Sequence, residues 1–409
     1  MKILFIHQNF PGQFLNLAPA LAKRGDEILA LTDENNKRRS TVQMLRYKTP
    51  EKIDRKLAGL GRTYCDHAER GWMVARACRL LRERHNYIPD VIFGHSGWGE
   101  TLFLQEIWPE ARLLVYAELM YQTRGHDVGF DPEISSGTLE SRVSTVARSA
   151  HLIQGLVQAD AGLSPTVYQA ETFPPELRSK LTVIHDGIDT EMVRPNPDAT
   201  LTLANGQVLR AGDEVISFVS RSLEPYRGFL QFMRALPAVM RARPNAQVVL
   251  IGGDGVSYGS PPEGGGSWKD KILGELDGQL DLSRIHFLGR VPYSRYLSLL
   301  QVARVHCYLT IPFVLSWSLT EAMAAACQIV ASDTAPVREL IKDGENGRLV
   351  DYFDREGLVQ ALIRALENDP KLVAMGVAAR KTIIDGYDFK TKSLPRLIDW
   401  VESYGPDKT

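Results

Sequence analysis

The chain has 409 residues, of which 44% are hydrophobic, so it can bury large cores, and its length predicts two or three domains, of which we take two as the starting hypothesis. A formal net charge of −1 argues against nucleic acid as a partner, because nucleic-acid-binding chains carry basic patches. The four cysteines lack C-x-x-C spacing, and neither a signal peptide nor a membrane-spanning run is recognisable, so we expect a cytoplasmic protein with reduced thiols.

Short apolar runs alternate with helical patterns along the chain, which is typical of parallel sheets built from βαβ units. In the first half we predict strands at 2–6, 27–31, 91–93, 113–117, 162–164 and 182–184. In the second half we predict strands at 215–220, 247–251, 285–288, 305–309 and 329–331. The sequence therefore predicts the α/β class, with two parallel sheets in tandem and ligands near the carboxyl ends of the strands.

Two loop patterns divide this series of elements. We place a domain linker at 195–198, followed by a type I′ hairpin at the Asn205-Gly206 pair. The stretch 255–268 is rich in glycine and proline, which predicts a mobile loop after a strand. We expect domains at 1–195 and 196–389, with a C-terminal helix at about 390–409 that packs back on the first domain.

Several well-known site motifs are absent from the sequence. There is no G-x-x-x-x-G-K-[ST] phosphate loop, and the best glycine cluster, IGGDGVSYG, has Tyr258 where a dinucleotide fingerprint needs its third glycine. There is also no H-E-x-x-H motif and no D-x-D pair to hold a metal against a diphosphate. A metal-independent chemistry is therefore favoured.

Two arginines flank the turn after the apolar strand predicted at 215–220. Arg221 and Arg227 lie on either side of it, and Gly228 opens an amphipathic helix. Guanidinium groups bond phosphate oxygens bidentately and a helix N-terminus adds partial positive charge, so this stretch predicts a diphosphate clamp. The alternative is a solvated turn with ordinary surface arginines.

The stretch PFVLSWSLTEAMAAA contains a single carboxylate, Glu321, preceded by the small residues Ser316 and Ser318. We expect Glu321 in the first turn of an alanine-rich helix, where its charge would complement the helix dipole. The functional alternative is that its carboxylate accepts hydrogen bonds from two vicinal hydroxyls, such as those of a ribose.

Five blocks in a fixed order carry a family resemblance: RSLEPYRG, IGGDG, IHFLGRVPY, SWSLTEAMAAACQIVASD and RELIKDGENGRLV. Together with VIHDGIDTEMVRP, they resemble the retaining nucleotide-sugar glycosyltransferases of family 4. The resemblance implies the GT-B fold, in which two Rossmann-like domains face each other across a cleft. It also implies transfer of a sugar to a hydroxyl acceptor from a nucleoside-diphosphate sugar, UDP- or GDP-linked, with no cofactor besides this donor substrate.

The resemblance implies roles for residues of the second domain. Arg221 and Arg227 match the basic residues that hold the donor diphosphate. Further donor-binding positions match Gly253, Asp254, Arg290, Val291, Leu315, Ser316 and Trp317. Glu321 matches the second glutamate of the family's E-x7-E motif, which binds ribose. The first glutamate of that motif is replaced by Phe313, whose ring cannot accept hydroxyl hydrogen bonds, so the contact to the donor sugar stays open.

In the first domain, Gly12 lies in a turn and resembles the family's glycine loop near donor phosphate and acceptor; the alternative is a purely structural turn glycine. His7, His95 and Glu118 each follow a predicted strand, so all three can face a ligand. The family often has histidine where Glu118 stands. We predict that His95 and Glu118 take part in catalysis at the acceptor, and the alternative is that they are satisfied polar residues.

The segment 36–62 has nine lysines and arginines against Glu51 and Asp54. Such a run is usually a solvated face. The competing hypothesis is peripheral contact with the inner face of an anionic membrane, since lipid-linked acceptors are common in the resembling family. A glycan, a small metabolite or a protein is equally open as the acceptor.

Two other functions fit the same architecture. A nucleotide-sugar epimerase needs titratable groups around the sugar. Phe313 makes the sugar site less polar, which argues against this function. A non-catalytic nucleotide-sugar-binding protein is the third possibility, in which chemistry was lost with the first glutamate of the motif.

Overall fold

The computed structural model describes residues 1–51, 59–135, 137–367 and 369–406. These residues form two compact units, the first of Met1–Arg124, Gly137–Gly187 and Lys390–Thr409, and the second of Gly125–Ser136 and Ile188–Phe389. The division after Gly187 differs from the predicted boundary at 195. That residues 125–136 belong to the second unit was not indicated by the sequence.

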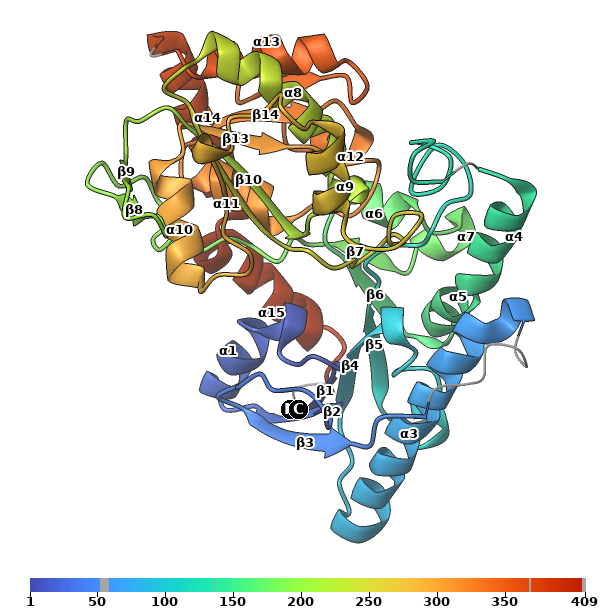
Figure 1. Cartoon of the computed structure of the whole chain (residues 1–409). Coiled ribbons are helices and arrows are strands. Elements are labelled where there is room, and N and C mark those ends of the chain that lie inside the picture. The colour runs from blue at the N-terminus through green and yellow to red at the C-terminus, as the bar shows by residue number, and fades with distance from the viewer. Residues whose placement is uncertain (52–58, 136, 368, 407–409) are drawn as a thin grey trace. The chain divides into compact units, whose positions relative to one another are not determined.

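The first unit is built on a seven-stranded parallel sheet (Figure 1). Its strands are β1 (Lys2–Ile6), β2 (Glu27–Asp33), β3 (Gln43–Tyr47), β4 (Val91–His95), β5 (Arg112–Tyr116), β6 (Ala161–Ser164) and β7 (Leu181–Val183). Its helices are α1 (Leu17–Lys23), α3 (Arg62–His85), α4 (Leu139–Arg148), α5 (Ala150–Gln158), α6 (Val167–Glu171), α7 (Pro175–Arg178) and α15 (Leu394–Glu402). The strand order β3-β2-β1-β4-β5-β6-β7 reverses direction between β1 and β4, so this pair is the topological switch point.

Aromatic residues fill the core of the first unit around β1. The ring of Phe14 lies 4.9 Å from that of Phe5 and 4.8 Å from that of Phe93. The C-terminal helix α15 adds Trp400, whose ring centroid is 5.3 Å from Phe93 and whose indole donates to Thr182 Oγ1 at 3.1 Å. Burial of these rings fixes the position of the ends of β1 and β4.

The second unit contains a six-stranded parallel sheet and a two-stranded ribbon (Figure 1). Its strands are β8 (Thr200–Thr202), β9 (Val208–Arg210), β10 (Val215–Ser222), β11 (Gln247–Gly253), β12 (Ile285–Phe287), β13 (Val305–Tyr308), β14 (Gln328–Ser332) and β15 (Arg348–Val350). Its helices are α8 (Phe229–Ala242), α9 (Trp268–Glu275), α10 (Tyr293–Val302), α11 (Trp317–Ala324), α12 (Ala335–Arg338), α13 (Arg355–Ala365) and α14 (Pro370–Tyr387). The sheet order β12-β11-β10-β13-β14-β15 places the switch point between β10 and β13.

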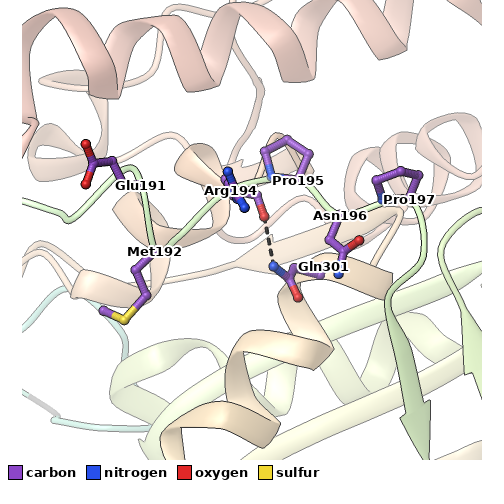
Figure 2. Close-up of a pocket in the computed structure, with 7 residues that line it drawn as sticks. All are labelled: Glu191, Met192, Arg194, Pro195, Asn196, Pro197 and Gln301. Atoms are coloured by element: carbon purple, nitrogen blue, oxygen red, sulfur yellow. Dashed lines mark hydrogen bonds between the residues drawn. The ribbon is translucent and has the colours of Figure 1, made fainter.

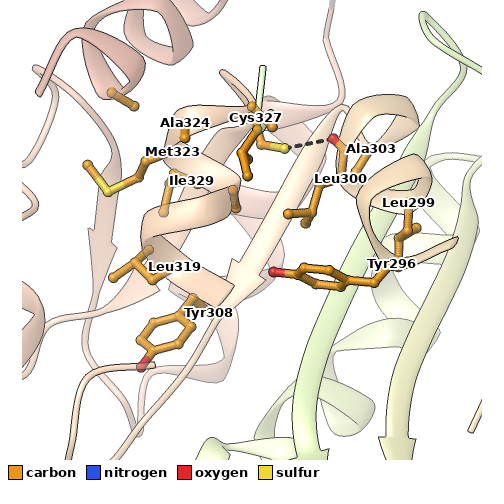
Figure 3. Packing of buried hydrophobic residues seen from close by; sticks show 14 of the residues in the cluster. Tyr296, Leu299, Leu300, Ala303, Tyr308, Leu319, Met323, Ala324, Cys327 and Ile329 are labelled. Carbon is orange, nitrogen blue, oxygen red and sulfur yellow. Dashed lines mark hydrogen bonds between the residues drawn. The ribbon is translucent and has the colours of Figure 1, made fainter. Parts of the chain in front are cut away.

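Helix α11 is held by the core of the second unit (Figure 3). Leu319 and Met323 of this helix are buried in one cluster with Tyr296 and Leu300 of α10 and with Tyr308 at the end of β13. The alanines of α11 let it pack closely on its neighbours, and this packing fixes the direction in which its N-terminal end points.

All eleven predicted strands are confirmed, most within one or two residues of their ends. The two parallel-sheet strands that the sequence did not indicate, β3 and β15, lie at sheet edges, where each pairs with a single neighbour. The predicted hairpin forms as β8 and β9, but the turn type was wrong: Gly206 has φ +85°, whereas Asn205 lacks the positive φ that a type I′ turn needs. In the described part of the chain, no helix combines the length and hydrophobicity needed to cross a bilayer.

Candidate functional site

In the second unit, the candidate site follows the switch-point strands β10 and β13. The chain after β10 carries Arg227 and Gly228, and the chain after β13 carries Phe313 and the start of α11. Gly228 has φ +65°, and a Cβ there would lie 2.3 Å from Leu309 Cβ, so this position needs glycine. The two loops therefore pack against each other at the carboxyl edge of the sheet.

Arg227 is a buried cation, only 7% exposed. Its Nη1 donates to the Tyr308 hydroxyl (3.2 Å), to Thr310 Oγ1 (3.1 Å) and to the Val314 carbonyl (2.7 Å), which are all uncharged oxygens. Within the described residues, no carboxylate forms an ion pair with it. A buried charge without a counter-ion is unfavourable, so the arrangement suits an anionic ligand.

The N-terminus of α11 is tied to this arginine through a shared hydroxyl. Tyr308 Oη accepts the hydrogen bond from Arg227 and a second one from the backbone N–H of Ser316 at 2.9 Å. Ser316 caps the helix, since its Oγ accepts from the N–H of Ser318 at 3.3 Å. Leu315 is half-buried and Trp317 is exposed beside this cap.

Glu321 does not lie in the first helical turn, which corrects the sequence-based expectation. The helix begins at Trp317, so Glu321 is its fifth residue. Its carboxylate accepts hydrogen bonds from the hydroxyls of Tyr293 (2.7 Å) and Tyr296 (2.6 Å). Burial raises the pKa of Glu321, and the two tyrosine hydrogen bonds oppose that shift. A dipole-capping role is excluded by this position, because the dipole effect fades beyond the first turn.

Phe313 is only 3% exposed. Its ring packs edge-on against Tyr226, with centroids 5.4 Å apart, and against Tyr258 at 5.0 Å. The Cζ atom of Arg227 lies 5.5 Å from the Phe313 ring centroid. An aromatic cluster thus lies beside the buried cation.

The other predicted donor-binding residues lie nearer the surface. The Arg290 guanidinium rests on Gly253, where an added Cβ would be 3.1 Å from Arg290 Nε. Asp254 forms an ion pair with Lys269 at 2.6 Å. Val291 is half-buried before α10, and Arg221 is exposed at the end of β10, where no described residue pairs with it.

In the first unit, the structure brings Gly12, His7 and Glu118 together at the ends of β1 and β5. Gly12 has φ +48°, and a Cβ there would lie 2.7 Å from His7 Nε2. His7 Nδ1 accepts from the N–H of Asn9 at 2.8 Å, so Nε2 carries the proton and donates to Gln13 Oε1 at 3.0 Å. Gln13 Nε2 donates in turn to Glu118 Oε1 at 3.3 Å.

His95, the last residue of β4, completes this cluster. Its Nδ1 accepts from the N–H of Gly97 at 3.0 Å, which leaves Nε2 facing Glu118 Oε2 at 3.8 Å. Its ring lies 5.3 Å from that of His7. Burial lowers the pKa of His7 to about 4 and holds the pKa of His95 well below its usual value. Both imidazoles are therefore neutral at physiological pH.

A hollow of about 580 Å³ lies elsewhere in the second unit, near the beginning of its Ile188–Phe389 segment (Figure 2). Its lining consists of Glu191, Met192, Arg194, Pro195, Asn196, Pro197 and Gln301. Gln301 Nε2 donates to the Arg194 carbonyl at 3.0 Å, as Figure 2 shows. None of the predicted site residues lines this hollow.

Sequence reasoning missed several polar residues of the site. No sequence pattern marked Tyr308 or Gln13, because each contributes through a hydrogen bond to a residue that is distant in sequence or on another element. Tyr293 and Tyr296 share one face of a helix at i, i+3 spacing, which was a usable signal. Glu224 was also missed, although it lies within the block RSLEPYRG.

Two family models match the chain. One, described as "Glycosyl transferase family 4 group", matches residues 24–193. The other, described as "Glycosyl transferases group 1", matches residues 204–382.

Among curated proteins, the chain is similar to the phosphatidyl-myo-inositol mannosyltransferase of Mycolicibacterium smegmatis, with 32% identity over 192 residues, 45% of this chain and 44% of the relative. The chain therefore spans less than half the length of this relative. A second relative from that organism, a GDP-mannose-dependent alpha-(1-6)-phosphatidylinositol monomannoside mannosyltransferase, is 22% identical over 86% of this chain and 87% of its own.

Two solved structures resemble nearly the whole chain. Sucrose-phosphate synthase from Thermosynechococcus elongatus has a TM-score of 0.71 at 17% identity and covers 99% of both chains. HepE from Anabaena, in complex with UDP and glucose, has a TM-score of 0.68 at 15% identity, over 98% of this chain and 100% of its own. At these identities the likeness shows a shared fold.

Proposed function

The chain belongs to the family 4 glycosyltransferases, with the GT-B fold, and we propose that it transfers a sugar from UDP or GDP to a hydroxyl acceptor. We further propose that the transfer retains the anomeric configuration and needs no metal ion. The observation that carries the proposed transfer from a nucleotide sugar is the buried guanidinium of Arg227 beside the N-terminus of α11, with no carboxylate partner among the described residues.

Arg227 and Arg221 would bind the donor diphosphate. The negative diphosphate would be the counter-ion that the buried Arg227 lacks. The negative charge on the diphosphate grows as its bond to the sugar breaks. Preorganised positive charge at that point lowers the barrier. The exposed Arg221 is free to reach the same ligand, and the dipole of α11 adds partial positive charge at its N-terminus.

Glu321 would bind the ribose of the nucleotide. Its carboxylate is held by two tyrosine hydroxyls, which leaves acceptor lone pairs for vicinal hydroxyls. The base would bind to the half-buried Val291 and to the backbone around Gly253 and Arg290. Asp254 would lie at the edge of the same region.

The cluster of the first unit would serve the acceptor. The chain from His7 through Gln13 to Glu118 orients one carboxylate oxygen, and neutral His95 faces the other. Glu118 would orient the acceptor hydroxyl or stabilise positive charge on the sugar. The leaving diphosphate would help to remove the acceptor proton in a front-side attack.

We propose an anionic, lipid-linked acceptor and peripheral membrane contact through residues 36–62. The named relatives act on phosphatidylinositol derivatives. In the described part of this segment, Arg46 and Lys48 line a hollow of about 680 Å³ together with Trp72, which is 49% exposed. Residues 52–58 lie outside the described residues. Binding to anionic vesicles that weakens with salt would support this contact, and no binding even at low salt would exclude it.

Labelled donors test the function itself. A panel of UDP- and GDP-sugars is first screened for protection against thermal unfolding, because a ligand that binds only the folded state raises the melting temperature. The stabilising donor is then incubated with the protein and candidate acceptors. Transfer or slow hydrolysis supports a glycosyltransferase, an epimerised product would show an epimerase, and binding alone would show a non-catalytic protein.

A further inference from the structure

The glycine-rich loop after β11 is anchored by a buried carboxylate that the proposed function does not use. Glu224 is fully buried, with 0% exposure. Its Oε1 accepts from the N–H groups of Ser257 (3.0 Å) and Tyr258 (3.2 Å), and its Oε2 accepts from the N–H of Gly259 at 3.0 Å. A buried carboxylate persists only when hydrogen bonds compensate its charge, so these three backbone groups and Glu224 fix one another.

This anchor sets the position of Tyr258. The Tyr258 ring lies 5.0 Å from the ring of Phe313, and the Cζ atom of Arg227 lies 5.7 Å from the Tyr258 ring centroid. Phe313 is buried, whereas Tyr258 is 36% exposed. Tyr258 is therefore the accessible member of the aromatic cluster beside the buried cation.

We propose that Tyr258 contacts the donor sugar where it joins the diphosphate, and that Glu224 is its positioning residue. This inference rests on the proposed function, because it takes Arg227 as the diphosphate ligand. A phenol can donate and accept hydrogen bonds, and its ring packs against the apolar face of a sugar. In the described structure the Tyr258 hydroxyl bonds no protein group. It supplies the polar contact that Phe313 cannot make.

The test compares a nucleoside diphosphate with its sugar conjugate on the full chain. UDP, GDP and the stabilising nucleotide sugar are titrated by calorimetry into the wild type, Tyr258→Phe and Tyr258→Ala. Loss of one hydrogen bond should weaken nucleotide-sugar binding about tenfold in Tyr258→Phe and further in Tyr258→Ala. Binding of the nucleoside diphosphate should stay within about twofold. The exposed Val256, in the same loop, gives the matched control Val256→Ala, which should bind both ligands as the wild type does.

The outcomes separate this inference from the proposed function. If no nucleotide or nucleotide sugar binds the wild type, the proposed function fails and this inference fails with it. If the wild type binds and Tyr258→Ala binds the nucleotide sugar equally well, only the inference is overturned. Equal weakening for nucleotide and nucleotide sugar would also overturn it, because Tyr258 would then not read the sugar.

A double-mutant cycle tests the role of Glu224. Glu224→Gln places an amide N–H₂ group against backbone N–H donors, so it should release the loop and weaken nucleotide-sugar binding selectively. Combined with Tyr258→Ala it should add no further loss, because both changes remove one contact. If the losses in affinity of the two single variants multiply in the double variant, Glu224 acts on binding independently of Tyr258. Tyr258→Phe leaves the anchor intact, so the proposal stays testable if Glu224→Gln does not fold.

Discussion

The Arg227 guanidinium donates a hydrogen bond to the Tyr308 hydroxyl at 3.2 Å, and that same hydroxyl accepts the Ser316 N–H at 2.9 Å. One oxygen thus joins the buried cation to the N-terminus of α11. Because Tyr308 accepts from both neighbours, its own proton is directed elsewhere. The two positive elements of the proposed diphosphate site are held in one geometry before any ligand arrives, which is the condition for electrostatic preorganisation.

Replacement of Arg227 by alanine should lower turnover by a factor of about a hundred or more. The variant loses the charge that we propose stabilises the leaving diphosphate. Arg227→Lys keeps the charge but loses the forked geometry, so it should retain intermediate activity. The measurement is the rate of donor hydrolysis or transfer at saturating donor. Arg241→Ala, which removes an exposed arginine of α8, is the matched control. Near-normal turnover of Arg227→Ala would refute the diphosphate role.

Replacement of Glu321 by glutamine should weaken binding of the nucleoside diphosphate by about tenfold or more, because charge-assisted hydrogen bonds to ribose become neutral ones. Tyr293→Phe removes one of the two hydroxyls that orient the carboxylate and should have a smaller effect in the same direction. Calorimetric titration measures both. Glu345→Gln, at an exposed ion pair with Lys342, should leave binding unchanged. If the 2′,3′-dideoxy nucleotide binds the wild type as tightly as the parent nucleotide, Glu321 does not bind ribose.

The strands were predictable because buried parallel strands are continuous apolar runs, and the residues that follow such runs can be identified. Arg227 and Glu321 were selected as candidates in this way, and their roles stay predictions. The burial of Arg227 was not predictable, since its partner Tyr308 is 81 residues away in the chain. The start of α11 was misplaced because Ser316 caps the helix, which puts Glu321 in its second turn. Edge strands such as β3 have a half-exposed pattern that resembles a loop.

Replacement of Gly12 by alanine should disturb the cluster of His7, Gln13 and Glu118, which we propose serves the acceptor. The positive φ of +48° costs an alanine about 1–2 kcal/mol, and the new Cβ would push His7 away from Gln13. Transfer should therefore fall more than donor hydrolysis does, because the contacts from His7 through Gln13 to Glu118 belong to the proposed acceptor site. Gly25→Ala is the matched control: it has φ +97° with no atom within 4 Å of the added Cβ, so it carries backbone strain without the clash. Equal effects of the two variants on transfer would contradict a role for this contact.

Acid should destabilise the fold through His7. Burial lowers its pKa to about 4 in the folded state, against 6.5 for the free side chain, so the unfolded chain binds the extra proton between these pH values. The contribution of His7 to stability is complete above pH 6.5 and declines as the pH falls towards about 4, where it amounts to a loss of about 3 kcal/mol. His7→Asn has no such proton to take up. Urea titrations from pH 7 to pH 4.5 should therefore show the wild type losing stability more steeply than His7→Asn, and parallel pH profiles would mean that His7 titrates alike in the folded and unfolded chains.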